Sequence, residues 1–253
     1  LDLLTFGSGE GTPESYVPDD VSAYMTLYWN VDEAYDNLEV LVDSIIGEGG
    51  FEAQVAGGFK EAVGADLRED IIASLGGRFT LATWMEPPAR INSQAVLLGV
   101  QLNDATAITD VLARVTELAE PIQQASHNNV SYYRVDVPTP PEPPQDAPGA
   151  VFQGFIRTPS PCFGIVGDYL LASDSEAFFQ HAIDTHVRGS DLLADSDDYK
   201  LIALHIKDQV KDQKASAIFF SQPQESFKLL FDLIADDKTK TLLSDNAEQN
   251  TVL

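Results

Sequence analysis

Apolar residues recur along this chain with two periods, the two-residue period of strands and the longer period of amphipathic helices. The first strand begins at about Val21, where two sets of residues alternate and aromatic side chains occur on both faces: Ala23, Met25, Leu27 and Trp29 against Tyr24, Thr26, Tyr28 and Asn30. Asp32 is typical of a helix N-cap. Apolar residues then follow at helical spacing until Gly47, namely Ala34, Leu38, Leu41, Val42 and Ile45. The pattern predicts a strand followed by a helix.

The same two patterns alternate over the rest of the chain. Helical spacing predicts helices over 51–63 and 67–75, from Asp104 as far as Pro121, after Ser175, over 196–210 and after residue 221. Alternation predicts strands over 78–85, 94–102, 130–137, 150–157, 162–166, 169–173 and 216–220. The sequence therefore predicts an α+β fold, with a mainly antiparallel sheet and helices packed on one face of it.

Two segments stand outside this alternation. Residues 1–20 are rich in Gly, Pro, Ser and acids without a sustained period, which predicts a flexible acidic tail. Residues 138–148 hold six prolines, which favour extended backbone. A PxxP recognition peptide is the alternative, but no Lys or Arg accompanies these prolines, and Glu142 and Asp146 lie among them. We therefore expect a stiff loop within a first α+β unit that spans 21–214.

A strand and helix near the end of the sequence resemble the first strand and helix. Ser216 and Ala217 begin a strand that precedes a striped helix, as Ser22 and Ala23 do, and the two segments are offset by 194 residues. The match predicts an internal duplication in which residues 215–253 are the start of a second, truncated repeat. The alternative is that any strand followed by a helix looks like any other.

Several short motifs also resemble a known family. They are Ser22-Ala23-Tyr24, Gly64-Ala65-Asp66-Leu67, Leu75-Gly76-Gly77-Arg78-Phe79, Tyr169-Leu170-Leu171-Ala172-Ser173 and Leu192-Leu193-Ala194-Asp195-Ser196. Together they resemble an uncharacterised bacterial family of duplicated α+β proteins, usually exported, that is known only as a domain of unknown function. The resemblance covers about 21–253 and rests mostly on turn and packing positions. It implies a two-copy α+β fold and an envelope or secreted location, and it implies no activity.

Composition adds a strong negative charge to this picture. The chain has 253 residues with 44% hydrophobic and 22% charged residues, which is typical of a globular protein rather than a disordered one. Forty acidic residues against 15 basic ones give a net charge of −25, and the first Lys or Arg is Lys60. Such a field repels phosphate backbones, so we expect no nucleic-acid partner.

Only a few features of the sequence bear on the compartment of the protein and on membrane association. A single cysteine, Cys162, rules out an intramolecular disulfide. The sequence opens at Leu1 rather than Met, which suggests a processed start and, with the acidic composition, favours a periplasmic or extracellular location over a cytosolic one. No apolar stretch approaches the ~20 residues that a bilayer crossing needs, so we expect no membrane span in this sequence.

Aromatic residues form the first candidate binding surface. Tyr24 and Tyr28 lie on the strand face opposite Met25 and Leu27, and Trp84 and Tyr132 or Tyr133 are expected to share their side of the sheet. Such a face can hold an apolar or sugar-like ligand or dock a partner. The alternative is that a second layer of the chain itself covers these side chains.

Acidic residues form the second candidate site. Asp195, Asp197 and Asp198 precede a predicted helix, where carboxylates can gather a hard cation such as Ca²⁺. The alternative is that they cap the helix and interact with its dipole. The four histidines have no zinc-like spacing, and no cofactor is expected beyond this Ca²⁺ site.

The sequence thus favours a non-catalytic structural or interaction protein of the cell envelope or extracellular space, with a protein partner or self-assembly. The alternative is a ligand- or cation-binding module that uses the aromatic face or the acidic helix ends. A hydrolase is the third hypothesis, because Ser/His/Asp triads assemble from distant positions that no local motif marks.

Overall fold

The computed structural model describes residues 5–90, 92–118, 121–138, 156–210, 213–235 and residue 240. Residues 139–155, which include nearly all of the predicted proline-rich loop, and residues 241–253 of the predicted second repeat lie outside the described residues.

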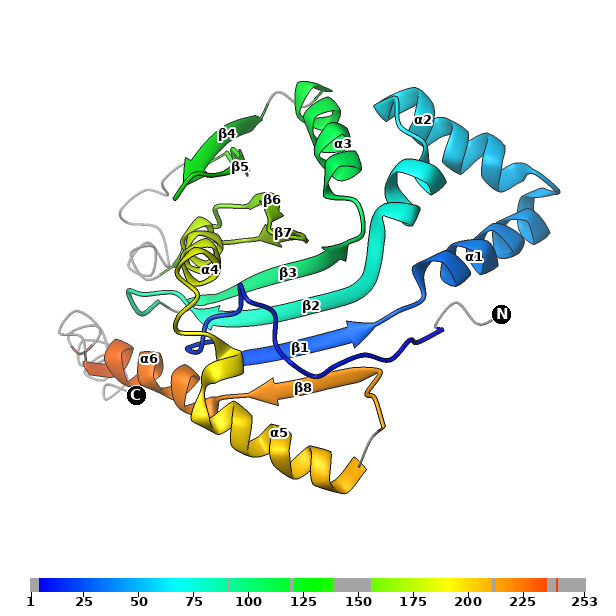
Figure 1. Cartoon of the computed structure of the whole chain (residues 1–253). Coiled ribbons are helices and arrows are strands. Elements are labelled where there is room, and N and C mark those ends of the chain that lie inside the picture. Colours follow the sequence, from blue (N-terminus) through cyan, green and yellow to red (C-terminus); the bar gives the residue numbers. More distant parts are fainter. Residues whose placement is uncertain are drawn as a thin grey trace, which may run out of the picture.

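The centre of the molecule is one open sheet of eight strands (Figure 1). Every neighbouring pair is antiparallel, which confirms the predicted α+β fold with an antiparallel sheet. The spatial order is β4-β5-β6-β7-β3-β2-β1-β8. The strands are β1 Ala23–Tyr28, β2 Leu75–Met85, β3 Gln94–Leu102, β4 Ile122–His127, β5 Val130–Val135, β6 Cys162–Val166, β7 Tyr169–Ser173 and β8 Ala217–Ser221.

Helices lie on one face of the sheet and beyond the ends of its strands. α4 (Glu176–Arg188) packs on β3, β6 and β7, with Phe178 and Phe179 fully buried beneath it. Its N-cap is Ser175, whose hydroxyl accepts a hydrogen bond from the Phe178 N–H. α5 (Asp197–Val210) reaches the same face through Tyr199, whose ring meets those of Tyr24 and Phe220. These contacts form the main core.

The remaining helical segments form a smaller group beyond one end of β1, β2 and β3 (Figure 1). Tyr35, Phe51 and Ala56 make a separate small core there. The predicted helices over 51–63 and 67–75 are each divided into short pieces of different helical type. The segments of this group are α1 Val31–Ile46, a π-helix Glu52–Ala56, α2 Gly57–Val63, a π-helix Leu67–Ile71, a 3₁₀ turn Ile72–Ser74 and α3 Ala105–Leu118. Two further segments lie outside the group, a 3₁₀ turn Leu193–Asp195 and α6 Pro223–Ala235.

The segment before β1 differs from the predicted flexible tail. Tyr16 and Val17 are fully buried in the main core, and Glu14 is buried beside them. The Tyr16 ring sits over Gly99 of β3, where a Cβ atom would clash with the hydroxyl, and meets the ring of Tyr169 edge-on. The backbone N–H groups of Gly7 and Gly9 also donate hydrogen bonds, to the carbonyls of Tyr28 and Ala215. The expectation of a tail over 1–20 is therefore corrected for the described residues 5–20, which form part of the covering layer. Gly and Pro obscure the strand and helix periods, so a segment of irregular backbone can be a core segment without a periodic signal.

β8 joins the sheet that contains β1 instead of starting a separate one. The two strands are antiparallel neighbours, and Met25 lies opposite Phe219, which is 194 positions further along the chain. A helix follows each of them, α1 and α6. This arrangement by itself does not show a duplication, which stays a prediction. β4, by contrast, was not predicted, because its sequence Ile122–His127 has few apolar residues.

Within the described residues, no helix is long and apolar enough to cross a membrane.

Candidate functional site

The four aromatic residues predicted as a ligand face lie on one face of the sheet, as the register requires. Tyr24 and Tyr28 alternate with Met25 in β1, Trp84 projects from the same face of β2, and Tyr132 from that of β5. This is the face that α4, α5 and residues 5–20 cover (Figure 1). The prediction that they share a face is therefore correct, and the chain itself provides the layer above them.

Each of these aromatic side chains is engaged by that covering layer. The Trp84 indole donates a hydrogen bond to Asp20 Oδ2 at 2.9 Å and its ring stacks on Phe178. The Tyr132 hydroxyl donates to Glu176 Oε1 at 2.6 Å. Tyr28 donates to the carbonyl of Glu10. The Tyr24 ring meets that of Tyr199 in α5. All four side chains therefore pack against the covering layer, and ligand binding on this face stays a prediction.

A buried carboxylate network holds the N-terminal segment on the sheet. Glu14 Oε1 lies 2.6 Å from Nε of Arg78, and its Oε2 accepts a hydrogen bond from the Tyr24 hydroxyl at 3.0 Å. Thr80 and Thr26 donate to the other carboxylate oxygen. Burial, with the negative charge of Glu14 next to it, raises the pKa of Tyr24 far above its ordinary value. The Tyr24 hydroxyl therefore remains a hydrogen-bond donor to Glu14, and the network joins the N-terminal segment to β1 and β2.

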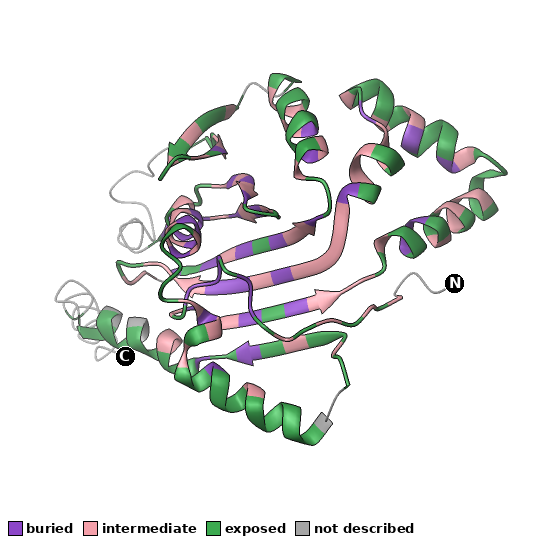
Figure 2. Ribbon diagram, in the orientation of Figure 1, coloured by how far each residue is buried: buried purple, intermediate pink, exposed green. Residues whose placement is uncertain are grey.

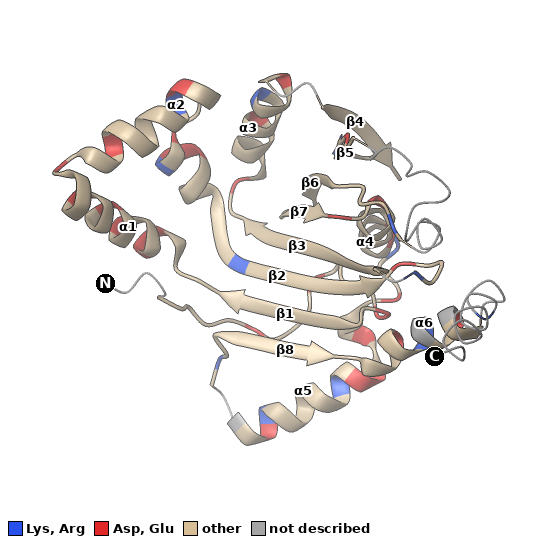
Figure 3. Ribbon diagram, turned by 180° about the vertical axis from the view of Figure 1, so that it is seen from behind, with Lys and Arg blue, Asp and Glu red and all other residues tan. Residues whose placement is uncertain are grey.

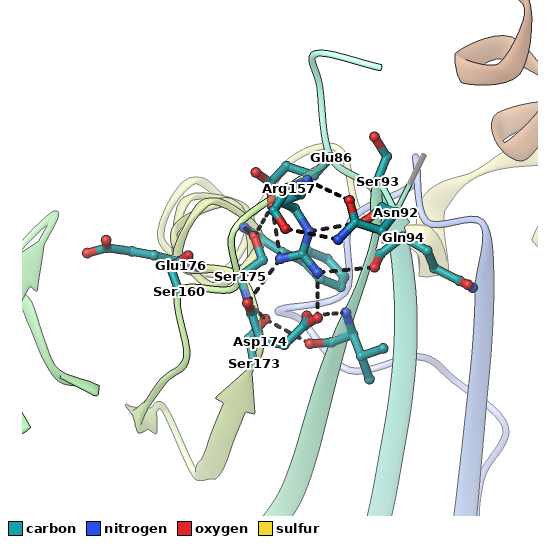
Figure 4. A network of polar contacts seen from close by, with 12 residues as sticks. Glu86, Asn92, Ser93, Gln94, Arg157, Ser160, Ser173, Asp174, Ser175 and Glu176 are labelled. Atoms are coloured by element: carbon teal, nitrogen blue, oxygen red, sulfur yellow. Dashed lines mark hydrogen bonds and ion pairs between the residues drawn. The ribbon is translucent and has the colours of Figure 1, made fainter. Parts of the chain in front are cut away.

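A second polar network lies where β2 ends and β3 begins (Figure 4). The guanidinium of Arg157 is buried and donates to the carbonyl of Asp174 at 3.0 Å and to its carboxylate. Glu86 lies 3.5 Å from the same guanidinium and accepts a hydrogen bond from the Ser175 hydroxyl. Asn92 both donates to and accepts from the backbone of Arg157. The guanidinium also donates to the carbonyls of Asn92 and Gln94, so the network joins the start of β3 to the start of α4.

The structure assembles no complete hydrolytic triad in the part of the chain that it describes. Ser15 Oγ lies 2.9 Å from Nδ1 of His186, but no carboxylate contacts that imidazole. His127 and His181 have carboxylate partners in Asp184 and Asp20, with no serine or cysteine beside them. The one cysteine is inert, because burial raises the pKa of the Cys162 thiol to about 12.

The predicted cation ligands are not brought together. Asp195 lies 3.1 Å from the ammonium of Lys200, while Asp197 and Asp198 lie exposed in the first turn of α5. In 5–90, 92–118, 121–138, 156–210, 213–235 and at 240, no three His, Cys, Asp or Glu side chains are grouped so as to hold a metal ion. Calcium binding at these three aspartates stays a prediction.

The other face of the sheet is open, and one row of side chains crosses seven strands of it. Figure 3 shows this face, with no helix over β1, β2, β3 and β8. Register places these residues side by side, each opposite the next. In order from β8 they are Phe219, Met25, Leu81, Leu98, Ala172, Phe163 and Tyr133. All of them are exposed or half-buried, with Phe219 67% and Leu98 50% exposed.

The strands behind this open face carry almost no charge. Among the eight strands only Arg78 and Arg134 are charged, and both project from the covered face, beside Tyr28 and Tyr132 in the alternation. In Figure 3 the acidic residues are instead concentrated on the helical segments around the sheet. In a chain of net charge −25, an uncharged face of this kind is the exception.

The β8 end of the sheet extends the apolar surface. Eight of the twenty large apolar side chains that are exposed in the described part lie between Leu201 and Ile234. They come from α5, β8 and α6, and both helices are drawn almost wholly in the colour of exposed residues in Figure 2. They are Leu201, Ile202, Leu204, Ile206, Phe219, Phe227, Phe231 and Ile234. We call the seven-residue row and these eight residues together the apolar surface. Phe219 belongs to both sets.

Charge is also distributed unevenly along the sequence. Residues 200–240 contain seven lysines and six acidic residues, so their net charge is +1. The rest of the chain contains eight basic and 34 acidic residues, a net charge of −26. The β8 end is therefore nearly neutral, in contrast to the remainder of the chain taken as a whole.

Two shallow hollows in the described surface lie mostly away from these residues. One lies between α3 and β4, lined in part by Thr116, Ile122 and Tyr133, and another lies beside Arg134 and Pro161. Neither has the enclosed apolar shape of a small-molecule site.

Sequence reasoning missed the apolar surface because it took the face of β1 with Tyr24 and Tyr28 as the candidate and proposed nothing for the opposite face, which carries Met25 and Leu27. The signal was present, since the strands contain apolar residues on both faces and almost no charge. Compared with protein-family models, curated proteins and solved structures, the chain shows no match.

Proposed function

We propose that this protein is a non-catalytic interaction module whose contact surface is the apolar surface on the open face of the sheet and its β8 end. The observation that carries the proposal is the uncharged row from Phe219 to Tyr133 in an otherwise strongly acidic protein. Apolar sheet faces are normally buried against a second layer. A face left open and rimmed by acidic helices is typical of a docking surface.

Size and shape support the same function. Seven strands at ~4.8 Å spacing span roughly 30 Å, and strands of five or more residues at ~3.3 Å per residue span at least about 16 Å. The face therefore offers at least roughly 500 Å², before the β8 end is added. A standard protein interface uses about 800 Å² from each partner. A flat area of this kind suits a macromolecule, whereas small ligands need an enclosed pocket.

The test is site-specific photo-cross-linking in the source cells. A photoreactive amino acid replaces Leu98 on the open face, and a control variant carries it at Val187 of α4, which is 52% exposed but lies away from the apolar surface. We expect a recurrent cross-linked polypeptide, identified by mass spectrometry, from position 98 and not from position 187. The product from position 98 should disappear when Met25→Lys is added, because that change places a charge in the row.

Two results would contradict the proposal. One is the absence of any product from position 98, and the other is the same set of products from both positions. Thermal unfolding of each variant accompanies the experiment, because a variant that unfolds would cross-link non-specifically. Whether the protein acts in the envelope or outside the cell stays a prediction.

A further inference from the structure

The outer edge of β8 exposes unpaired backbone groups. The Tyr28 N–H donates to the carbonyl of Ser216, and the Gln222 N–H donates to the carbonyl of Ser22. Because the hydrogen-bonding direction alternates along an antiparallel strand, residues 216, 218, 220 and 222 face β1. The N–H and C=O groups of Ala217, Phe219 and Ser221 consequently point away from the sheet, and no described strand lies beside them.

The sequence of this edge lacks the residues that usually hinder pairing. Natural edge strands carry charged residues, prolines or bulges that hinder the approach of another strand. β8 is Ala-Ile-Phe-Phe-Ser, with none of these. α5 lies alongside β8 in both Figure 1 and Figure 3 and exposes Leu201 and Leu204. The edge therefore offers backbone hydrogen bonds and apolar contacts at the same place.

The uneven distribution of charge along the chain indicates which kind of partner can bind at β8. A basic protein would be attracted to the acidic remainder of the chain, with net charge −26, and not to residues 200–240, with net charge +1. Two copies of this chain repel each other over most of their surfaces for the same reason. They can approach without that repulsion where both are nearly neutral and apolar, which is the β8 end.

We propose that a second copy of this chain pairs with β8 through its own β8, antiparallel and about a two-fold axis, so that the two sheets continue into one. The proposal rests on the proposed function, because it names the partner that binds the β8 end of the apolar surface. The geometry is self-complementary. Phe219 lies opposite Phe219 of the second copy, Ala217 lies opposite Ser221 and Ser221 opposite Ala217, so that all the outward N–H and C=O groups of these residues are paired.

The apolar surface near β8 is large enough to contribute to a dimer contact. Eight exposed apolar side chains lie on α5, β8 and α6, from Leu201 to Ile234. At roughly 100 Å² of exposed surface each they offer at most roughly 800 Å², the share of one partner in a standard interface.

Sedimentation of the purified chain tests this dimer. We expect a concentration-dependent monomer–dimer equilibrium whose association constant rises with sodium chloride, because salt screens the repulsion between two chains of charge −25. Phe219→Lys should weaken association by about 30-fold or more, since it replaces the central aromatic contact with two like charges. Val187→Lys is the matched control, with the same charge change at a similarly exposed apolar residue of α4, and should dimerise like the unaltered chain.

A mixture of two variants tests the register. Phe219→Lys and Phe219→Asp should each be monomeric alone, and an equimolar mixture should restore the dimer, because the register places residue 219 opposite itself. A chain that stays monomeric at all concentrations and salt levels overturns the proposal. So does a dimer that Phe219→Lys leaves intact, or a mixture that does not associate. If the chain is monomeric while position 98 still cross-links another polypeptide, the second copy is excluded and the interaction function stands.

Discussion

Arg78 and Glu14 form a buried ion pair between β2 and the segment that precedes β1, with Nε of Arg78 2.6 Å from Oε1 of Glu14. The Glu14 side chain is fully buried and that of Arg78 is nearly so. The pair fixes the N-terminal segment across the covered face and so leaves the opposite face as the one that faces solvent. Both sequence positions look unremarkable in isolation, since one lies among Gly and Pro and the other is a lone base in a strand.

Glu14→Gln should destabilise the protein strongly. The substitution keeps the size of the side chain but leaves the Arg78 guanidinium without a counter-charge in a buried site, which costs about 3–5 kcal/mol. Urea unfolding measures the loss. Glu10→Gln, at an exposed position in the same segment, should change stability by less than about 0.5 kcal/mol. Equal unfolding midpoints for the two variants would contradict the role given to Glu14.

Asp20→Asn should destabilise the protein near neutral pH and lose this effect in acid. Burial alone would raise the pKa of the Asp20 carboxyl, but the hydrogen bond and charge of His181 and the Trp84 N–H hold it below its ordinary value. A carboxyl whose pKa is lower in the folded state stabilises the protein above its unfolded pKa, about 3.9, and loses that contribution as the pH falls through its folded pKa. Unfolding in urea at pH 5 and pH 3 tests this.

The control for this prediction is Asp110→Asn on α3, where the carboxylate is exposed. Its effect on the free energy of unfolding should be small at both pH values. A difference between the Asp20→Asn variant and the unaltered protein that persists unchanged at pH 3 would show that the carboxylate is not stabilised by His181 and Trp84.

Cys162 should react with thiol reagents only when the protein unfolds. Burial raises the pKa of this thiol to about 12, so at pH 8 the reactive thiolate is about a thousandfold scarcer than for an ordinary cysteine. Labelling in the folded state is expected to be slower than in urea by at least that factor. Cys162→Ala with Ser190→Cys, which places the thiol at an exposed loop position, provides a rapidly labelled control. Rates within tenfold of each other for the two sites would refute the burial of Cys162.

Salt should stabilise the folded protein. A net charge of −25 repels itself in the compact state, and salt screens this repulsion within a Debye length of ~8–10 Å. The melting temperature should therefore rise by several degrees across a sodium chloride series, and calcium should add little beyond its ionic strength. A sharp rise with millimolar Ca²⁺ at fixed ionic strength, abolished when Asp195, Asp197 and Asp198 are changed together to Asn, would instead establish a cation site.

Much of the local structure followed from sequence because it depends on neighbours within a few residues. The strands over 78–85, 94–102, 162–166 and 169–173 were predicted from alternation, and they are present as β2, β3, β6 and β7. The helix predicted after Ser175 is α4, and the Ser175 hydroxyl accepts a hydrogen bond from the Phe178 N–H. β4 was missed because its side chains are mostly polar and give no apolar alternation. Its backbone nevertheless pairs with β5.

Sequence by itself determined the fold class, the alternation that separates Tyr24 from Met25, and the acidic charge from which we expect no nucleic-acid partner. It did so because these properties are set by residue type and by spacing along the backbone. Only the tertiary structure decided which face of β1 is covered. That choice depends on contacts between residues far apart in the chain, such as Glu14 with Arg78, Tyr16 with Gly99 and Trp84 with Phe178. Both faces of the sheet are apolar enough to be buried, and the N-terminal segment and α4 can lie on only one of them.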